Sequence, residues 1–346
     1  MSERLRPRHR QLRSTTIARR ARLMPSSDTE RSSKRPQEVC APRSPAPNRQ
    51  RAHFRPLLIA TRPRQWMKNL LVFAAPGTAG LLGRPAILGR TALAAGVFLI
   101  ASAGTYLLND AIDAPSDRVH PEKRHRPVAA RELSATLAIA VGIALLVLAV
   151  VAASFLGGML LACVIGAYVV TSVTYTLWLK QVAVIEIACI SAGFVLRAVA
   201  GGAAVHISIS PWFAIVTSSA ALLVVAGKRS AEIDLLGRAG GYHRKVLERY
   251  TKPYLRSIRL IASSVAIMSF SLWAFERAAH IAVGHADADD VLFQLAILPF
   301  VLGVLSVELA FESGEGGAPE ELVLHNRVIQ VLALSCLARV AFGIYT

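Results

Sequence analysis

The chain has 346 residues, of which 53% are hydrophobic and 18% are charged, with a formal net charge of +17. Soluble domains usually carry about a quarter charged residues, whereas no charged side chain occurs here in residues 91–109, 133–179 and 198–227. Because a bilayer-spanning helix needs roughly 20 apolar residues, these runs predict an all-α, polytopic membrane protein and exclude soluble, disordered, collagen-like and disulfide-stabilised classes.

The N-terminal residues 1–55 differ from the rest of the chain. They hold 15 Lys and Arg but four acidic residues, are rich in Arg, Ser and Pro, and show no apolar period. This composition predicts a disordered tail followed by a transmembrane domain at 56–346. Three interpretations stay open: a variable tail or an over-long start before Met24, adhesion to anionic lipid, and nucleic-acid binding. Since most of the excess charge lies in the tail, no nucleic-acid partner is predicted for the whole protein.

Nine membrane spans are predicted along the remaining sequence, at approximately 66–83, 90–109, 134–153, 158–177, 183–204, 210–227, 255–276, 291–310 and 326–345. Lys and Arg gather in two long loops, 110–133 and 228–254, whereas the loop 278–290 is acidic. Cytoplasmic loops carry the excess of Lys and Arg, so both long basic loops are predicted to face the cytoplasm.

The first basic loop begins with an acidic cluster at the end of the second predicted span. Asp110, Asp113 and Asp117 follow Asn109 at i, i+3 and i+7 spacing, which places the carboxylates on one helix face. Converging carboxylates repel one another unless a cation neutralises them, and Mg²⁺ binds through one or two carboxylates plus substrate phosphates. A magnesium–phosphate site is therefore predicted, although Pro115 would kink the helix before Asp117. The alternative is a helix end followed by a solvated, self-paired loop.

Basic side chains that suit phosphate oxygens follow this cluster at Lys123 and Arg126. The second basic loop carries a matching cluster at Lys228, Arg229 and Glu232. That cluster is more basic than acidic, so it predicts an anion site with at most one or two metal ligands. An amphipathic interfacial helix is the alternative.

Further candidate residues lie near the cytoplasmic ends of the spans. Lys68 belongs to a basic, aromatic segment before the first span, which snorkelling interface anchors would explain equally well. Arg197 lies inside the fifth span, and Glu186 precedes it by about 16 Å along a helix. The two side chains cannot touch at that separation, but both could line one cavity. Tyr175 and Lys180 lie at the junction of the fourth and fifth spans.

These residues resemble a known family. The pattern Asn109-Asp110-x-x-Asp113-x-x-x-Asp117 is similar to the first aspartate-rich motif of the UbiA superfamily of intramembrane prenyltransferases. Over about residues 56–345, the chain looks closest to the actinobacterial subfamily of decaprenyl-phosphate phosphoribosyltransferases, through the segments 62–69, 120–127, 175–180, 193–202, 227–232, 247–251, 272–276 and 326–333. Typical prenyl-diphosphate enzymes carry a second aspartate-rich motif where this chain has Lys228-Arg229-x-x-Glu232.

The resemblance implies nine helices around a cytoplasm-facing cavity in the plasma membrane. It implies transfer of 5-phosphoribose from phosphoribosyl pyrophosphate to a polyprenyl (decaprenyl) phosphate, releasing pyrophosphate, for precursors of cell-wall arabinan in arabinogalactan. Mg²⁺ would bind Asp110, Asp113 and Asp117, and the catalytic residues would be Asp110, Asp113 and Glu186. Substrate contacts are expected from Asn109, Lys68, Lys123, Arg126, Tyr175, Lys180, Arg197, Lys228, Arg229 and Glu232.

Two other function classes stay open from the residues. One is prenyl transfer from a prenyl diphosphate to an aromatic acceptor, and the other is a transporter with ion sites at the membrane midplane. The transporter predicts charged residues deep in the spans, whereas most of the charges noted here gather at one mouth. Homo-oligomerisation is also left open by the sequence.

Overall fold

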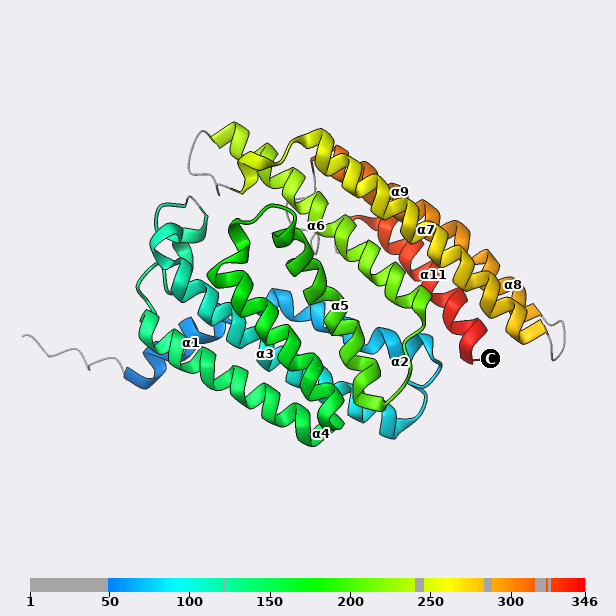
Figure 1. Cartoon of the computed structure of the whole chain (residues 1–346), viewed down its shortest axis with the longest axis horizontal. Coiled ribbons are helices and arrows are strands. Elements are labelled where there is room, and N and C mark those ends of the chain that lie inside the picture. The colour runs from blue at the N-terminus through cyan, green and yellow to red at the C-terminus, as the bar shows by residue number, and fades with distance from the viewer. Residues whose placement is uncertain are drawn as a thin grey trace, which may run out of the picture. The chain divides into compact units, whose positions relative to one another are not determined.

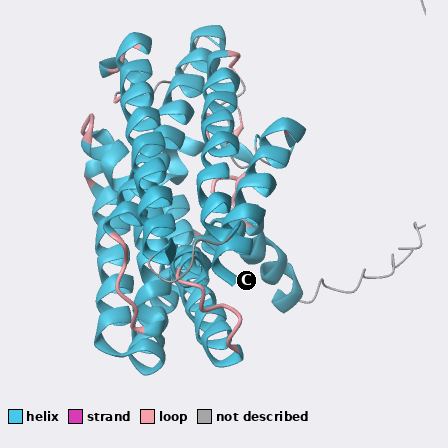
Figure 2. Ribbon diagram, turned by 90° about the vertical axis from the view of Figure 1, so that its right-hand side faces the viewer, coloured by secondary structure: helices cyan, strands magenta, loops and turns pink. Residues whose placement is uncertain are grey.

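The computed structural model describes residues 49–120, 122–239, 246–282, 288–314, 322 and 325–345. The chain divides into two units, Met1–Ala46 and Pro47–Thr346, and every described residue belongs to the second unit. All regular secondary structure in these described ranges is helical (Figure 2), which confirms the predicted all-α class. Residues 1–48, which make up most of the predicted tail, lie outside the described residues.

The helical elements follow one another in chain order (Figure 1). They are α1 (Arg49–Ala60), η1 (Pro63–Phe73), α2 (Ala74–Thr78), α3 (Pro85–Asp117), η2 (Lys123–His125), α4 (Ala135–Leu177), η3 (Leu179–Gln181), α5 (Ile185–Val205), α6 (Pro211–Ala239), η4 (Leu247–Arg249), α7 (Lys252–Ala282), α8 (Ala288–Leu295), α9 (Ile297–Glu312) and α11 (Arg327–Tyr345), the η elements being 3₁₀ helices.

Seven helical segments in the described residues are long and apolar enough to cross a membrane, as expected of a multi-pass membrane protein. Eight of the predicted spans fall on them, because the spans 134–153 and 158–177 both lie in α4. The remaining predicted span, 66–83, is the first in chain order and falls mainly on η1 and the short helix α2. The count of nine spans therefore stays a prediction.

A break in the middle of α4 explains why one helix contains two spans. At 43 residues, a straight α4 would be about 65 Å long, roughly twice the hydrocarbon thickness of a bilayer. Gly157 and Gly158 leave helical geometry, and Gly158 has φ 65° and ψ −162°. Such a backbone is accessible essentially to glycine alone. The chain reverses direction there, and the two halves continue as separate passes (Figure 1).

Small residues bring η1 against α5, which positions one wall of the site. The main buried cluster joins α3, α4 and α5 through alanines such as Ala101, Ala153 and Ala200, and small residues let membrane helices approach closely. At Gly201 in α5, a Cβ atom would lie 1.8 Å from the backbone oxygen of Val72 in η1. Any larger residue would therefore push η1 away from α5.

Candidate active site

A cavity of about 280 Å³ lies among η1, the η2 loop, α3, α4, α5 and α6. Seven basic side chains line it, whereas Glu232 is its one acidic lining residue among the described parts of the chain. The basic residues are Arg62, Lys68, Lys123, Arg126, Arg197, Lys228 and Arg229. Since so many cations repel one another in a partly apolar site, the cavity is suited to a ligand with several negative charges.

The cavity gathers nine of the ten predicted substrate-binding residues: Lys68, Asn109, Lys123, Arg126, Tyr175, Arg197, Lys228, Arg229 and Glu232. Lys180 is not among its lining residues, and neither are Asp110, Asp113, Asp117 and Glu186. The four carboxylates instead form ion pairs with basic residues, and of these Arg62, Arg126 and Arg229 line the cavity.

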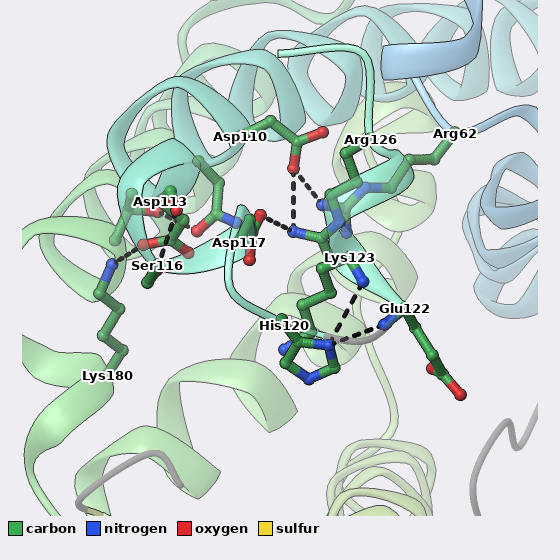
Figure 3. A network of polar contacts seen from close by, with 12 residues as sticks. Arg62, Asp110, Asp113, Ser116, Asp117, His120, Glu122, Lys123, Arg126 and Lys180 are labelled. Carbon is green, nitrogen blue, oxygen red and sulfur yellow. Dashed lines mark hydrogen bonds and ion pairs between the residues drawn. The ribbon is translucent and has the colours of Figure 1, made fainter. Parts of the chain in front are cut away.

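Two of the aspartates on α3 share one arginine (Figure 3). The Arg126 Nη1 atom donates to Asp110 at 3.2 Å and to Asp117 at 2.7 Å, and Arg62 also donates to Asp110. Both carboxylates are buried. The helix continues through Pro115 to Asp117, so the expected kink does not remove Asp117 from the face of Asp110.

Asp113 pairs separately, with Lys180 of η3 (Figure 3). The three aspartates therefore do not converge, and no group of three or more His, Cys, Asp or Glu side chains in the described ranges is placed to share a metal ion. The donor chemistry nevertheless fits Mg²⁺, which prefers oxygen ligands and takes only one or two carboxylates beside substrate phosphates. The Asn109 amide, which lines the cavity, and the neighbouring carboxylates supply such oxygens.

The second predicted cluster is organised around Arg229 of α6. Its Nε and Nη2 atoms donate to the two carboxylate oxygens of Glu186 at 2.8 and 2.5 Å, and Nη1 donates to Glu232 at 2.5 Å. Glu186 is fully buried and does not line the cavity. It therefore fixes the orientation of Arg229, and its predicted role in catalysis stays a prediction.

Arg197 lines the cavity from α5 and is held by neutral groups. It donates to Asn69 Oδ1 at 3.1 Å, to the Gly193 carbonyl at 2.6 Å, to Ser102 Oγ at 3.1 Å and to the Tyr168 hydroxyl at 3.3 Å. Its guanidinium also lies 4.9 Å from the Phe98 ring centroid. Glu186 is not among its contacts, as the helical spacing requires.

Sequence reasoning overlooked a row of neutral polar residues on α4. Five of them line the cavity at i, i+3, i+4, i+7 and i+8 spacing: Tyr168, Thr171, Ser172, Tyr175 and Thr176. Of these, the prediction included Tyr175 alone. The others lie in a run that was noted for its lack of charge, so a search for hydroxyl groups at helical spacing would have found them.

The loop after α3 carries two of the basic residues that line the cavity, Lys123 and Arg126. His120 Nδ1 accepts hydrogen bonds from the backbone N–H groups of Glu122 at 3.2 Å and Lys123 at 3.3 Å (Figure 3). Partial burial and the nearby Lys123 lower the pKa of His120. Burial and the Arg62 guanidinium lower the pKa of Arg126, against the opposing effect of Asp110 and Asp117.

Comparisons with known proteins agree with this architecture. The sequence pattern of the UbiA prenyltransferase family matches residues 70–230. The chain is 40% identical over 294 residues to a decaprenyl-phosphate phosphoribosyltransferase of Corynebacterium glutamicum, covering 84% of this chain and 86% of that protein. It is 38% identical over 292 residues to one of Mycobacterium tuberculosis, covering 82% and 94%.

Solved structures give the same fold. A UbiA homologue from Archaeoglobus fulgidus bound to GPP and Mg²⁺ aligns with a TM-score of 0.61 at 16% identity, covering 84% of this chain and 99% of that one. At that identity the likeness concerns the fold alone. The extent of identity to the two phosphoribosyltransferases, together with the matched pattern, leads to the conclusion that this chain belongs to the UbiA prenyltransferase family.

Proposed function

We propose that the protein transfers the 5-phosphoribosyl group of phosphoribosyl pyrophosphate to decaprenyl phosphate and releases pyrophosphate. The observation that carries this proposal is the cavity that seven basic side chains and one acidic side chain line among the residues described by the structure. A donor with three phosphate groups and an acceptor with one phosphate both need such a site. The relatives from Corynebacterium glutamicum and Mycobacterium tuberculosis, named for decaprenyl phosphate and phosphoribosyl transfer, support this choice of substrates.

In the proposed reaction, the bond between ribose C1 and the pyrophosphate oxygen breaks, and the pyrophosphate leaves with the electron pair. A phosphate oxygen of the lipid forms the new bond to C1 from the opposite face, through an oxocarbenium-like transition state. The lipid phosphate is already anionic, so it needs little help from a general base. Lys123, Arg126, Lys228 and Arg229 would stabilise the charge that develops on the leaving group.

We also propose that Mg²⁺ in the donor complex is held by one or two of the carboxylates of Asp110, Asp113 and Asp117, with Asn109 and the pyrophosphate oxygens. A bound Mg²⁺ would supply further neutralisation of the pyrophosphate oxygens. The oxygen-only donor set supports this assignment, as does the UbiA homologue that was solved with GPP and Mg²⁺. The ion pairs to Arg62, Arg126 and Lys180 would then exchange in part for contacts to metal and phosphate.

A second cavity of about 490 Å³ supports a lipid acceptor. It is almost wholly apolar and lies among α6, α7, α9 and α11, with aromatic walls from Phe213, Phe270, Trp273 and Phe300. Helix α6 lines both cavities, so a prenyl chain in the second would lie one helix away from the cationic site. We place the enzyme in the plasma membrane with the cationic site facing the cytoplasm, where the product would serve cell-wall arabinan synthesis.

The test is a transfer assay with purified full-length protein in detergent. Phosphoribosyl pyrophosphate labelled in the ribose is incubated with decaprenyl phosphate and Mg²⁺, and labelled lipid and free pyrophosphate are measured. We expect both products in equal amounts, and neither after omission of the lipid. A parallel reaction contains geranyl diphosphate and 4-hydroxybenzoate. Prenylated aromatic product without labelled lipid would contradict the proposal and favour an aromatic prenyltransferase.

A further inference from the structure

Buried arginines in the described helices are neutralised in two different ways. Arg197, Arg229 and Arg259 are each at most 5% exposed. Two of them pair with two glutamates each: Arg229 with Glu186 and Glu232, and Arg259 with Glu308 and Glu312. No ion pair involves Arg197 within the described residues, where its contacts are the neutral oxygens of Asn69, Ser102, Tyr168 and Gly193.

This difference matters because an isolated cation inside a membrane protein is expensive. Neutral hydrogen bonds and aromatic faces orient the Arg197 guanidinium and reduce the penalty, but they carry no compensating charge. A guanidinium has five N–H groups, and the four contacts above leave one of them, on Nη1, for another acceptor. Since Arg197 lines the cationic cavity, the missing negative charge can come from a ligand in that cavity.

The depth of Arg197 indicates which ligand. It lies twelve residues into α5, about 18 Å from the end of the helix that also carries Glu186. Its partner Ser102 lies eight residues before Asp110, about 12 Å deeper along α3. The phosphate of a lipid stays near the level of the headgroups, whereas a water-soluble donor can enter the cavity fully. The deep anion is therefore assigned to the donor.

The two ends of the cavity also differ in charge. At the end formed by the η2 loop, Lys123 and Arg126 lie with the carboxylates of Asp110 and Asp117, which suits a pyrophosphate with a divalent cation. The deep end offers one cation and neutral hydroxyl and amide groups, which suit a single phosphate. Phosphoribosyl pyrophosphate carries a pyrophosphate on C1 and a single phosphate on C5, at opposite ends of the ribose.

We infer that Arg197, oriented by Asn69, Ser102 and Tyr168, binds the 5-phosphate of the donor and selects phosphorylated over unphosphorylated ribosyl donors. This inference rests on the proposed function. It makes Arg197 a specificity-determining residue that contacts substrate, and it makes Ser102 and Asn69 positioning residues.

The sharpest test gives Arg197 an internal counter-ion. In Ser102→Asp the new carboxylate lies beside the Nη2 atom that the serine hydroxyl now contacts at 3.1 Å. Ser102→Asn has the same size without the charge and is the matched control. We expect Ser102→Asp to weaken binding of ribose 5-phosphate, measured by calorimetry, by about 100-fold, because a desolvated charge contact is lost. Ser102→Asn should weaken it far less.

A second test changes the donor as well as the residue. Wild type and Arg197→Gln are compared with phosphoribosyl pyrophosphate and with ribosyl 1-diphosphate, which has a 5-hydroxyl group. Either change alone should lower kcat/KM by about 100-fold, and the two together should lower it no further. Arg197→Lys should restore part of the loss. Arg339→Gln, which alters a half-buried arginine of α11 that does not line the cavity, should leave both donors unaffected.

The outcomes separate this inference from the proposed function. Equal losses of Arg197→Gln with both donors, or a raised KM for decaprenyl phosphate alone, would overturn the assignment of the 5-phosphate. Equal binding of ribose 5-phosphate by Ser102→Asp and Ser102→Asn would do the same. If wild type transfers no ribose, the proposed function fails, and the calorimetric comparison still decides whether Arg197 binds a sugar phosphate.

Discussion

The three aspartates of α3 have the same side chain but different surroundings, so they should contribute differently to the stability of the fold. Asp110 is buried between Arg62 and Arg126, and Asp117 shares the same Arg126. Asp113 has Lys180 as its ion-pair partner, and both side chains retain some exposure, 12% and 15%. The same substitution should therefore affect the fold to different degrees at Asp110 and Asp113.

Replacing Asp113 by asparagine should abolish transfer while lowering the melting temperature less than Asp110→Asn, because Asp113 pairs with one cation instead of two and its side chain is 12% exposed instead of 2%. Asp110→Asn should abolish transfer and also destabilise the fold by about 3 kcal/mol, since the Asp110 carboxylate is buried and neutralises both Arg62 and Arg126. Both effects are measured on detergent-purified protein, by the labelled-donor assay across a Mg²⁺ titration and by thermal unfolding. Mg²⁺-dependent transfer by both variants would contradict the proposed metal site.

The loop histidine should make activity depend on pH. His120 Nδ1 can accept the backbone N–H groups of Glu122 and Lys123 only while that nitrogen is unprotonated. Its pKa is lowered below the ordinary value of about 6.5 by partial burial and Lys123. The folded loop thus prefers neutral histidine, and its stability is lost as the pH falls from about 6.5 through the lowered pKa.

Transfer should therefore decline in acid as the turn that carries Lys123 opens. His120→Ala lacks this titration and should show a flatter acid limb in the pH profile of kcat/KM. Substrate phosphates titrate equally in both proteins, so the difference between the two profiles isolates the histidine. Identical profiles would exclude a role for His120 in holding the loop.

The sequence allowed much of the site to be predicted, for reasons visible at single residues. Charges in a membrane domain are rare, so Arg197, Lys228 and Arg229 stood out and do line one cavity. Hydroxyl groups do not stand out, and Ser102 and Tyr168 were missed. The pairing of Glu186 with Arg229 could not be read from the chain either, because the two residues lie on different helices and 43 positions apart.

At the scale of elements, hydropathy located the long helices but not their irregularities. Averaging over a span hides a single charge, so Arg259 and Glu308 were overlooked within the predicted spans 255–276 and 291–310. In the structure they connect α7 to α9, with Arg259 Nε donating to Glu308 at 3.1 Å. Hydropathy likewise predicted only a short gap between the spans 134–153 and 158–177. In the structure, the non-helical dihedral angles at Gly158 produce the break in α4.

Replacing Gly158 by alanine should therefore destabilise the protein by about 1–3 kcal/mol, since φ 65° with ψ −162° is strained for any residue with a Cβ atom. Gly166→Ala, farther along the same helix, is the matched control, because its added Cβ would meet no atom within 4 Å. It should leave stability unchanged or raise it slightly. Thermal unfolding of both variants measures the difference, and equal melting temperatures would show that the turn tolerates a side chain.

At the scale of the whole molecule, the cationic cavity and the apolar cavity are built mainly from different parts of the chain. Within the described ranges, every residue that lines the cationic cavity lies between Arg62 and Glu232. The apolar cavity draws mainly on α6, α7, α9 and α11. We propose on this basis that residues 56–346 act as one catalytic domain and that the basic tail takes no part in transfer.

Two truncations test this division. Removal of residues 1–46, the first of the two units, should leave kcat and both KM values unchanged, because every cavity-lining residue in the described part of the chain is retained. Removal of residues 1–60 also deletes α1, whose Ala60 is 1% exposed and packs in a cluster with Leu107 and Leu133. This longer truncation should lower the melting temperature and the activity together, since it uncovers apolar surface next to the α3 helix that carries the aspartates. Loss of transfer from the shorter truncation, with its melting temperature unchanged, would show that the tail contributes directly to catalysis.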